Sequence, residues 1–466
     1  QDSWTLKRLT VNYGARWEYF SHGRPAENSP AGRYTGARAF DKLDMPTWKS
    51  LSPRGGAVFD VFGNQRTAIK LSVGKYMQAG STGFSESYNP LALTTATVAW
   101  TDLNRDGLPQ GELGCVYQTA GCEINLAQLP NGFGVASLSN FDPDIKRMYN
   151  IEEAVSIQHE ILPRVSVTAG WYHRDYKNLR RRDNLLQTPA DYTRFTLFSP
   201  IDGTPITYYN VSAAKRSAVS YLDRTAGSDR TMKYDGFEYS FNARLPRGAS
   251  LFGGGMSEKA IAKICDEVAN PNLLLYCDQS QSGIPFRTQF KIAGSVPVVF
   301  GIQVGFSLQS LPGYGYGTGA LASREGGPTG PTGQPSAAQL NTPNGAGTVW
   351  LITPSSTYTS SSPCVAQGKC TAGQLVDPGM TVASLSVPLV APNTEFGDRI
   401  NQLDLNVTKT IKFGRASIQP KFDLFNALNV APVYGVRSMN FGTTSYLQPS
   451  SILNGRVFQL GAILKF

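Results

Sequence analysis

The stretch GRVFQLGAILKF, residues 455–466, closes the chain with a strict alternation of side chains. Every second residue is apolar and the final one is aromatic; these positions are Phe458, Leu460, Ala462, Leu464 and Phe466. The intervening residues, from Val457 to Lys465, are mixed. Because successive side chains of a β-strand point to opposite faces, the stretch predicts a strand with one fully apolar face.

The same alternation recurs earlier in the chain, for example over residues 9–18, 302–309 and 416–424. In each case one face is apolar and the other is hydrophilic or small. Short turn sequences join consecutive segments, at 63–64, 163–164, 246–248, 297 and 413–415. Together with a leading strand over 8–20 and the closing strand, these hairpins predict about twelve antiparallel strands, each long for a globular protein.

Long segments alternate with these tight turns, at 21–49, 79–147, 179–231, 260–285, 311–398 and 428–454. Structureless loops of this length are uncommon in a soluble propeller or sandwich. Outer-membrane barrels, by contrast, combine short periplasmic turns with long extracellular loops, an apolar outside and a polar interior. The sequence therefore predicts an all-β fold, an antiparallel transmembrane β-barrel. About twelve strands could close alone or form part of a larger barrel, because lipid tolerates no open edge.

Composition excludes several other classes of protein. No run of about 18 apolar residues occurs, so we expect no transmembrane helix. The net charge of +9 is spread along the chain, and we interpret its one basic run, Arg180-Arg181-Arg182, as a solvated loop rather than a nucleic-acid site. His22, His159 and His173 join no nucleophile-and-acid pattern, and no catalytic motif occurs, so we expect no enzyme.

The six cysteines form three close pairs in sequence, Cys115/Cys122, Cys265/Cys277 and Cys364/Cys370. None is a C-x-x-C and none is adjacent to histidine, which argues against zinc. All three pairs fall in the long segments. Local disulfides in an oxidising compartment explain this spacing better than the alternative of six free thiols.

The segment WTDLNRDGLPQGELG, residues 100–114, resembles the first half of a calcium loop. Asp102, Asn104 and Asp106 alternate before Gly107, as in D-x-N-x-D-G, so that oxygen ligands can wrap a hard cation. Glu112 is one position short of the usual bidentate glutamate. The motif therefore indicates a calcium site at Asp102, Asn104, Asp106 and Glu112, with a plain Asp/Asn/Gly-rich turn as the alternative.

Several strand segments resemble the C-terminal barrel of TonB-dependent outer-membrane receptors, in particular the Oar-like branch. They are LTVNYGARWEYF (9–20), SPRGGAVFDVFGNQRTAIKLSVGKY (52–76), YDGFEYSFNARLP (234–246), NQLDLNVTKT (401–410), KFDLFNALN (421–429) and the terminal strand. The most specific combination is DLFNALN followed by a last strand that ends in Phe. The resemblance covers the strands and not the loops.

The resemblance implies a 22-stranded barrel around an N-terminal plug, preceded by a box that pairs with TonB. No plug or box is found here, so residues 1–466 are interpreted as the C-terminal portion of the barrel. The terminal strand, with Phe458, Leu460, Ala462, Leu464 and Phe466, resembles the signal read by the barrel-assembly machinery, and strand addition supplies a mechanism for that recognition. The expected location is the outer membrane of a Gram-negative bacterium, in contact with its lipid.

The implied function is uptake of a bulky solute, which the sequence leaves open as a sugar, a peptide or a metal chelate. A stand-alone passive pore and a surface adhesin or secretion factor are the alternatives. The Gly/Pro-rich segment 313–339 is expected to be a mobile extracellular loop, either a lid or a plain tip. Asp404, Asn406, Lys421 and Asp423 are expected to face the interior, where they contact a plug or form a solvated wall.

Overall fold

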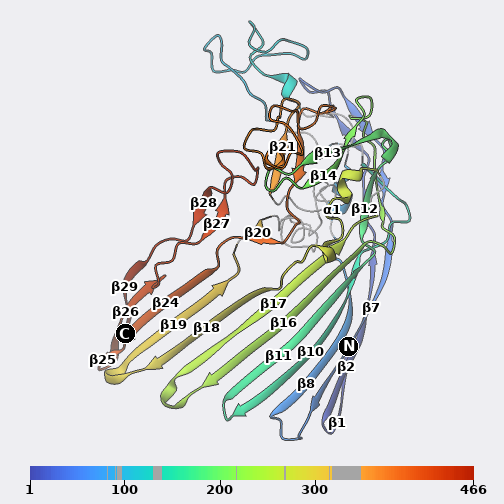
Figure 1. The fold of residues 1–466 in the computed structure, drawn as a ribbon. Helices are drawn as coiled ribbons and strands as arrows, with labels where there is room; N and C mark the ends of the chain where they lie inside the picture. Colours follow the sequence, from blue (N-terminus) through green and yellow to red (C-terminus); the bar gives the residue numbers. More distant parts are fainter. Residues whose placement is uncertain are drawn as a thin grey trace.

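The computed structural model describes residues 1–80, 82–89, 91, 97–129, 139–216, 218–266, 269–313, 315–316 and 348–466. One antiparallel sheet of fourteen strands dominates it (Figure 1). Its strands run in the order β1 (Asp2–Leu6), β2 (Leu9–Phe20), β7 (Trp48–Asp60), β8 (Thr67–Met77), β10 (Tyr149–Leu162), β11 (Val165–Lys177), β16 (Thr231–Arg244), β17 (Ser250–Lys263), β18 (Arg287–Pro297), β19 (Ile302–Leu311), β24 (Ile400–Lys409) and β26 (Ala416–Phe425). Two further strands pair with β26, namely β25 (Ile411–Phe413) and β29 (Val457–Lys465).

The strand count differs from the sequence-based prediction at two places. β1 was not expected; it pairs with β2 across a tight turn in which Lys7 has a positive φ of 51°. β25 follows β24 after a one-residue break and pairs with the same strand, β26, so the two form one interrupted strand. The alternation of side chains therefore located the strands correctly but could not reveal a five-residue edge strand.

The turns between paired strands follow the prediction in four places and depart from it in one. The Pro163-Arg164 turn joins β10 and β11 directly, with Arg164 at a φ of 70°. The predicted two-residue turn at 63–64 is instead a longer loop, because β7 ends at Asp60. The Asp60 carboxylate accepts hydrogen bonds from the backbone N–H groups of Gly63 and Gln65, at 3.0 and 2.9 Å, which stabilises this wider connection.

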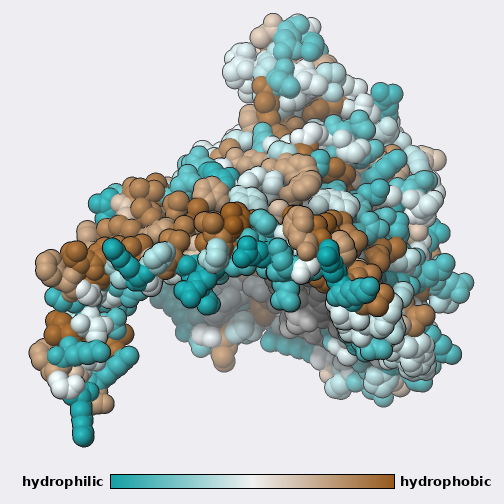
Figure 2. Space-filling view, turned by 90° about the horizontal axis from the view of Figure 1, so that it is seen from below, coloured by the Kyte–Doolittle hydropathy of each residue, from teal (hydrophilic) through white to brown (hydrophobic). Residues whose placement is uncertain are grey.

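The two faces of the sheet differ in chemistry, as the alternation predicted. Large apolar side chains are exposed on the convex face, including Trp17 (63%), Phe237 (50%) and Leu460 (81%). Seen from below, the sheet is an open arc with hydrophobic patches along its convex side and hydrophilic side chains along its concave side (Figure 2). Exposed apolar area of this extent is stable in contact with lipid rather than water.

The sheet is curved but open in the part of the chain that the structure describes. β1 pairs only with β2, and β29 pairs only with β26, so the two lie at opposite edges (Figure 1). The unpaired backbone groups of such edges require partners within a bilayer. No helix among the described residues is long and apolar enough to cross a membrane.

The long connections gather beyond one end of the sheet, where they form small sheets of their own (Figure 1). These pair β12 (Arg180–Asn184) and β9 (Ser139–Phe141) with β15 (Tyr221–Thr225), and also pair β13 (Tyr192–Phe198) with β14 (Pro205–Val211), β21 (Val349–Ile352) with β22 (Leu385–Pro388), β27 (Val433–Val436) with β28 (Pro449–Ile452), β3 (Gly23–Arg24) with β6 (Leu43–Asp44), β4 (Glu27–Ser29) with β5 (Arg38–Phe40), and β20 (Gly315–Tyr316) with β23 (Glu395–Phe396). Short helices complete this loop layer: α1 (Gly83–Glu86), α4 (Pro363–Ala366), and 3-10 turns at Leu126–Gln128, Pro189–Asp191, Pro246–Gly248, Pro271–Leu274, Gln279–Gln281 and Val299–Gly301. The expected mobile loop 313–339 lies almost entirely outside the described residues.

Candidate functional site

The concave wall is hollowed where small residues from neighbouring strands meet. Gly14, Gly56, Ser72, Ala154 and Ser156 line a hollow of about 700 Å³ on β2, β7, β8 and β10, with Tyr172 of β11 beside them. Larger cationic side chains border the same hollow; they are Arg16, Arg54 and Lys70. An anionic or hydrogen-bonding group can therefore approach the backbone closely at this stretch of the wall.

A second hollow of about 440 Å³ lies further along the same wall, on β11, β16, β17 and β18. Its floor includes Gly170 and Gly254, and Glu238, Gln289 and Lys291 contribute polar groups. The second hollow thus combines charges of both signs with a neutral amide, whereas the first is bordered by cations. A surface of this kind suits hydrated solutes or a polar protein segment rather than lipid.

The four residues expected to face the interior all lie on this concave face, where they contact one another or the adjacent chain. Asn406 and Asp423 are paired in the β24–β26 register, and the Asn406 amide donates a hydrogen bond to Asp423. Lys421 Nζ lies 2.8 Å from the other carboxylate oxygen of Asp423. Asp404 accepts a 2.8 Å hydrogen bond from the Asn426 backbone. Their contact with a plug remains a prediction.

The loop layer has a hydrophobic core of its own, which sequence reasoning did not anticipate. Leu197 comes from one long connection, and Ile352 and Val387 come from another far away in the chain, yet all three are fully buried in this core. The Cys364–Cys370 disulfide lies in this core, and the Cys115–Cys122 and Cys265–Cys277 disulfides also form, which confirms all three predicted pairs. The layer therefore presents a folded surface above the hollowed wall.

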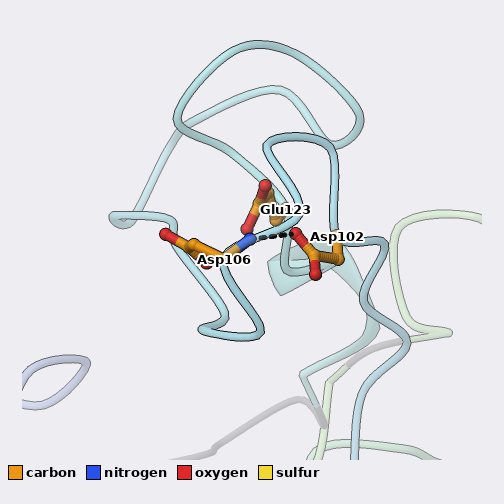
Figure 3. A group of neighbouring side chains, drawn as sticks. All are labelled: Asp102, Asp106 and Glu123. Atoms are coloured by element: carbon orange, nitrogen blue, oxygen red, sulfur yellow. Dashed lines mark hydrogen bonds between the residues drawn. The ribbon is translucent and has the colours of Figure 1, made fainter.

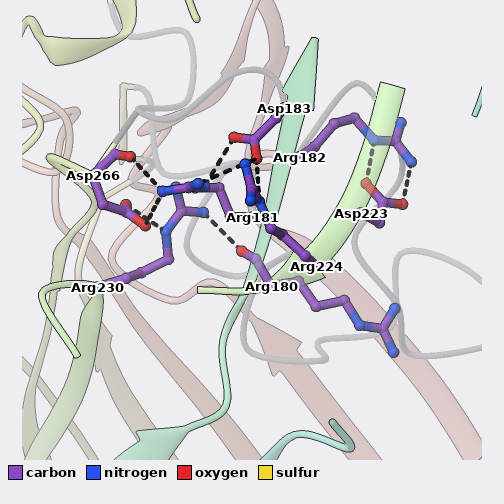
Figure 4. Close-up of polar contacts among 8 residues, drawn as sticks. All are labelled: Arg180, Arg181, Arg182, Asp183, Asp223, Arg224, Arg230 and Asp266. Atoms are coloured by element: carbon purple, nitrogen blue, oxygen red, sulfur yellow. Dashed lines mark hydrogen bonds and ion pairs between the residues drawn. The ribbon is translucent and has the colours of Figure 1, made fainter. Parts of the chain in front are cut away.

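Arginine and aspartate side chains form a buried network at the base of the loop layer (Figure 4). Arg182 and Asp223 face each other across the β12–β15 pair and make two hydrogen bonds of 2.6 Å, with side chains 2% and 3% exposed. The Tyr88 hydroxyl donates to the same carboxylate at 2.8 Å. Asp183 and Asp266 bind further arginines of the network, which are Arg181, Arg224 and Arg230.

The interpretation of Arg180-Arg181-Arg182 as a solvated loop is therefore wrong. Arg180 and Arg182 are buried, because the strand β12 turns them into the loop layer. The Arg180 guanidinium lies 4.0 Å from the centroid of the Phe84 ring, and burial lowers its pKa to about 10. Asp183, a partner of Arg181, directly follows the run, but Asp223 and Asp266 lie about 40 and 80 residues away in the chain, so no local sequence signal could identify those two.

His22 occupies an aromatic cluster next to this network. Its ring lies 4.7, 5.2 and 5.3 Å from the ring centroids of Phe20, Trp48 and Phe84, and neither ring nitrogen has a hydrogen-bond partner. Burial lowers the pKa of His22, and the positive charge of Arg180 lowers it further. The cluster therefore holds the imidazole in its neutral form.

We expect acid to destabilise this cluster through His22. Because its pKa is lower in the folded state than the ordinary value of 6.5, the unfolded state binds the proton first. The contribution to stability is complete above about pH 6.5 and is lost as the pH falls through the folded pKa. Thermal unfolding of the wild type and His22→Phe from pH 8 to 5 measures this: the wild type should lose more stability in acid. Parallel pH profiles of the two proteins would contradict it.

The other two histidines have partners within the sheet. His159 Nδ1 lies 2.8 Å from the Thr67 hydroxyl. His173 Nδ1 lies 2.8 Å from Asp235 Oδ1, and its ring stacks on Trp171 with centroids 5.6 Å apart. The two polar contacts connect neighbouring strands, β8 with β10 and β11 with β16, and the Trp171–His173 stack lies within β11.

The structure brings together only part of the predicted calcium set. Asp102, Asp106 and Glu123 offer carboxylate oxygens that all lie within 4.8 Å of one another (Figure 3). Glu112 lies outside this group and forms an ion pair of 3.2 Å with Arg33 instead. The sequence analysis missed Glu123 because it lies many residues after the motif. Its position directly after Cys122 could have indicated that a disulfide holds it close to this loop.

The terminal strand lies as its alternation predicted. β29 pairs with β26 along its whole length, and the predicted apolar positions Phe458, Leu460, Ala462 and Leu464 share the convex face. Phe466 follows the strand and is 98% exposed. An exposed edge with alternating side chains is the geometry required for strand addition.

Comparison of the sequence with protein families gives one extensive match. Residues 1–459 match the family described as "Outer membrane beta barrel domain", which accounts for nearly the whole chain. The chain belongs to this family. Its convex face is therefore the lipid-facing surface of a transmembrane β-barrel in the outer membrane, as predicted from the alternating strands and long loops.

Solved structures similar to this outer-membrane barrel include the ferric-catecholate import receptor Fiu from Escherichia coli K12, with 12% identity, a TM-score of 0.43, and 98% of this chain and 42% of that chain covered. The Escherichia coli outer membrane transporter YddB is similar with 11% identity, a TM-score of 0.43, and 99% and 52% coverage. The siderophore receptor PiuA from Acinetobacter baumannii has 9% identity, a TM-score of 0.44, and 98% and 41% coverage. This chain thus spans about half of their length or less. No curated protein sequence matches it.

Proposed function

We propose that this chain forms the C-terminal part of the barrel of a TonB-dependent receptor that imports a bulky solute across the outer membrane. The observation that carries the proposal is the combination of a lipid-facing convex side with a hollowed, charged concave wall below a folded loop layer. A protein that is only anchored in the membrane needs the apolar face but not a charged, hollowed interior wall. The polar wall and the ordered loops are useful where a hydrated solute is bound and then passed inward.

The open edges of the sheet support a place within a larger barrel. β1 and β29 each have one paired neighbour among the described residues, and in this proposal further strands of the full-length barrel pair with both edges. The cationic hollow bordered by Arg16, Arg54 and Lys70 is the part of the wall best suited to a polar plug segment or an anionic solute. Energy coupling to TonB would then act through that plug, and assembly would begin at β29.

An uptake experiment with defined probes tests this proposal. Cells with and without the native full-length protein are given a radioactive ferric catecholate, a labelled oligosaccharide and a labelled oligopeptide, each with and without a protonophore. A receptor predicts protein-dependent uptake of one probe that stops when the protonophore collapses the proton gradient. Uptake that continues would indicate a passive pore. Unchanged uptake of all three probes, with surface attachment lost on deletion of residues 348–392, would indicate an adhesin.

A further inference from the structure

The loop between residues 99 and 125 is a compact unit whose two arms are held together by backbone hydrogen bonds. Thr101 donates to the Glu123 carbonyl at 2.8 Å, and Glu123 in turn donates to the Gln110 carbonyl at 2.7 Å. The Cys115–Cys122 disulfide closes the far arm one residue before Glu123. These contacts fix Glu123 against the turn at 102–107, which it approaches from another part of the loop (Figure 3).

Glu123 has an unsatisfied carboxylate oxygen in this position. Its side chain is buried, with the residue only 1% exposed. One carboxylate oxygen accepts hydrogen bonds from the backbone N–H groups of Leu103 and Asn104, at 2.8 and 3.2 Å. The other oxygen, Oε2, is buried with no hydrogen-bond partner. A buried carboxylate oxygen without a donor is costly unless a cation occupies the space beside it.

Two further carboxylates converge on the same point. Oxygens of Asp102, Asp106 and Glu123 lie within 4.8 Å of one another, and a calcium ion with bonds of about 2.3–2.6 Å can bridge oxygens up to roughly 5 Å apart. Within the described part of the chain, none of the three forms an ion pair with lysine or arginine, and the nearby Arg33 is paired with Glu112. Three negative charges therefore meet without a protein cation to balance them.

The turn at 102–107 presents its oxygens in the way a cation requires. Asp102 accepts from the backbone of Asp106 and Gly107 at 3.2 and 3.0 Å, which curls the chain around the carboxylate. Each of these bonds uses one lone pair and leaves another for a metal. One carboxylate oxygen of Asp106 accepts a 2.7 Å hydrogen bond from the Leu108 backbone N–H, and the other accepts from the side-chain amides of Asn104 and Gln110. Asp106 is also exposed, which leaves a path for the ion from solvent.

We propose that Asp102, Asp106 and Glu123 bind one calcium ion that fixes this extracellular loop. The predicted ligand Asn104 instead donates through its side-chain amide to Asp106 and Gln110. Glu123 supplies the buried ligand that the linear motif lacks, and the Cys115–Cys122 disulfide positions it. Glu112 contributes differently, because its ion pair with Arg33 joins this loop to the connection at residues 21–47. Calcium binding would thus stiffen two neighbouring parts of the loop layer.

Calorimetric titration of the native full-length protein in detergent, freed of metal with EGTA and titrated with CaCl₂, tests the proposal. The wild type should bind with a Kd of about 10⁻⁴–10⁻³ M, the range of extracellular calcium modules. Glu123→Gln should weaken binding roughly tenfold or more, because it removes one ligand charge. Glu112→Gln, a matched change in the same loop, should bind as the wild type does. No binding by the wild type, or equal losses in both variants, would overturn the proposal.

Proteolysis gives a second readout that does not depend on the heat of binding. Arg105 lies inside the proposed site, so calcium should slow tryptic cleavage after it in the wild type and in Glu112→Gln, but not in Glu123→Gln. The Cys115–Cys122 disulfide, checked by mass after alkylation, shows whether the variant loop has folded. If Glu123→Gln fails this check, Asp102→Asn replaces it, with the same expected loss. Calcium-independent cleavage of the wild type would contradict the site.

Discussion

Leu460→Arg is expected to remove most of the assembled protein from the outer membrane. Leu460 lies on the convex face of β29 and is 81% exposed, opposite Phe422 of β26. An arginine on the lipid face near the bilayer midplane costs about 2–4 kcal/mol, which is a large part of a typical folding free energy. The change also interrupts the apolar row proposed as the assembly signal. Immunoblots of outer-membrane fractions, with the gel shift of the unheated folded barrel, measure the loss.

The neighbouring position provides the matched control. Gln459 is next to Leu460 in sequence but points to the concave face, where it is paired with Asp423. Gln459→Arg adds the same side chain to the polar wall, beside a carboxylate, and should leave assembly close to wild type. Equal losses from the two substitutions would show that the alternation does not separate a lipid face from a polar face, which would contradict the barrel assignment of β29.

Asp223→Ala is expected to unfold the β12–β15–β9 sheet of the loop layer. The substitution leaves the Arg182 guanidinium buried without its carboxylate, and it removes the acceptor of the Tyr88 hydroxyl. Breaking a buried ion pair by removing one partner typically costs about 3–5 kcal/mol. Hydrogen exchange of the native protein should show lost protection over residues 180–184 and 221–225, while the long strands of the main sheet keep theirs.

An exposed ion pair serves as the control for this effect. Lys42 and Asp44 are 2.8 Å apart, but their side chains are 67% and 75% exposed. Solvent-exposed pairs contribute about 0–1 kcal/mol, so Asp44→Ala should leave hydrogen exchange in the loop layer nearly unchanged. Protection at β12 and β15 that survives Asp223→Ala would show that the Arg182–Asp223 pair does not hold the loop layer together.

The sheet was predictable from the sequence because its signal is local. A period of two in hydrophobicity, repeated between short turns, places each strand and each of its faces without knowledge of its neighbours. Leu460 and Gln459 illustrate this, since their opposite environments follow from their positions in the alternation alone. The edge strand β1 was missed because five residues before a turn carry too few periods to be recognised.

The loop layer could not be predicted in the same way because its contacts join distant segments. Leu197 and Ile352 meet in one core, and Arg182 finds its partner at Asp223, without any periodic pattern that marks them. The calcium motif shows both cases. Asp102 and Asp106 are recognisable from their spacing, whereas Glu123 is brought to them by the Cys115–Cys122 disulfide and by hydrogen bonds between the two arms of the loop.

The intact mass of the native protein that carries this C-terminus, purified from its outer membrane, tests the central claim most directly. In a larger, plug-gated receptor barrel, the strands outside this chain pair with β1 and β29. The mass should therefore be well over twice the 50.5 kDa of the chain. A mass near 50.5 kDa would mean that β1 and β29 must pair with each other to close a small barrel, and would contradict the receptor mechanism.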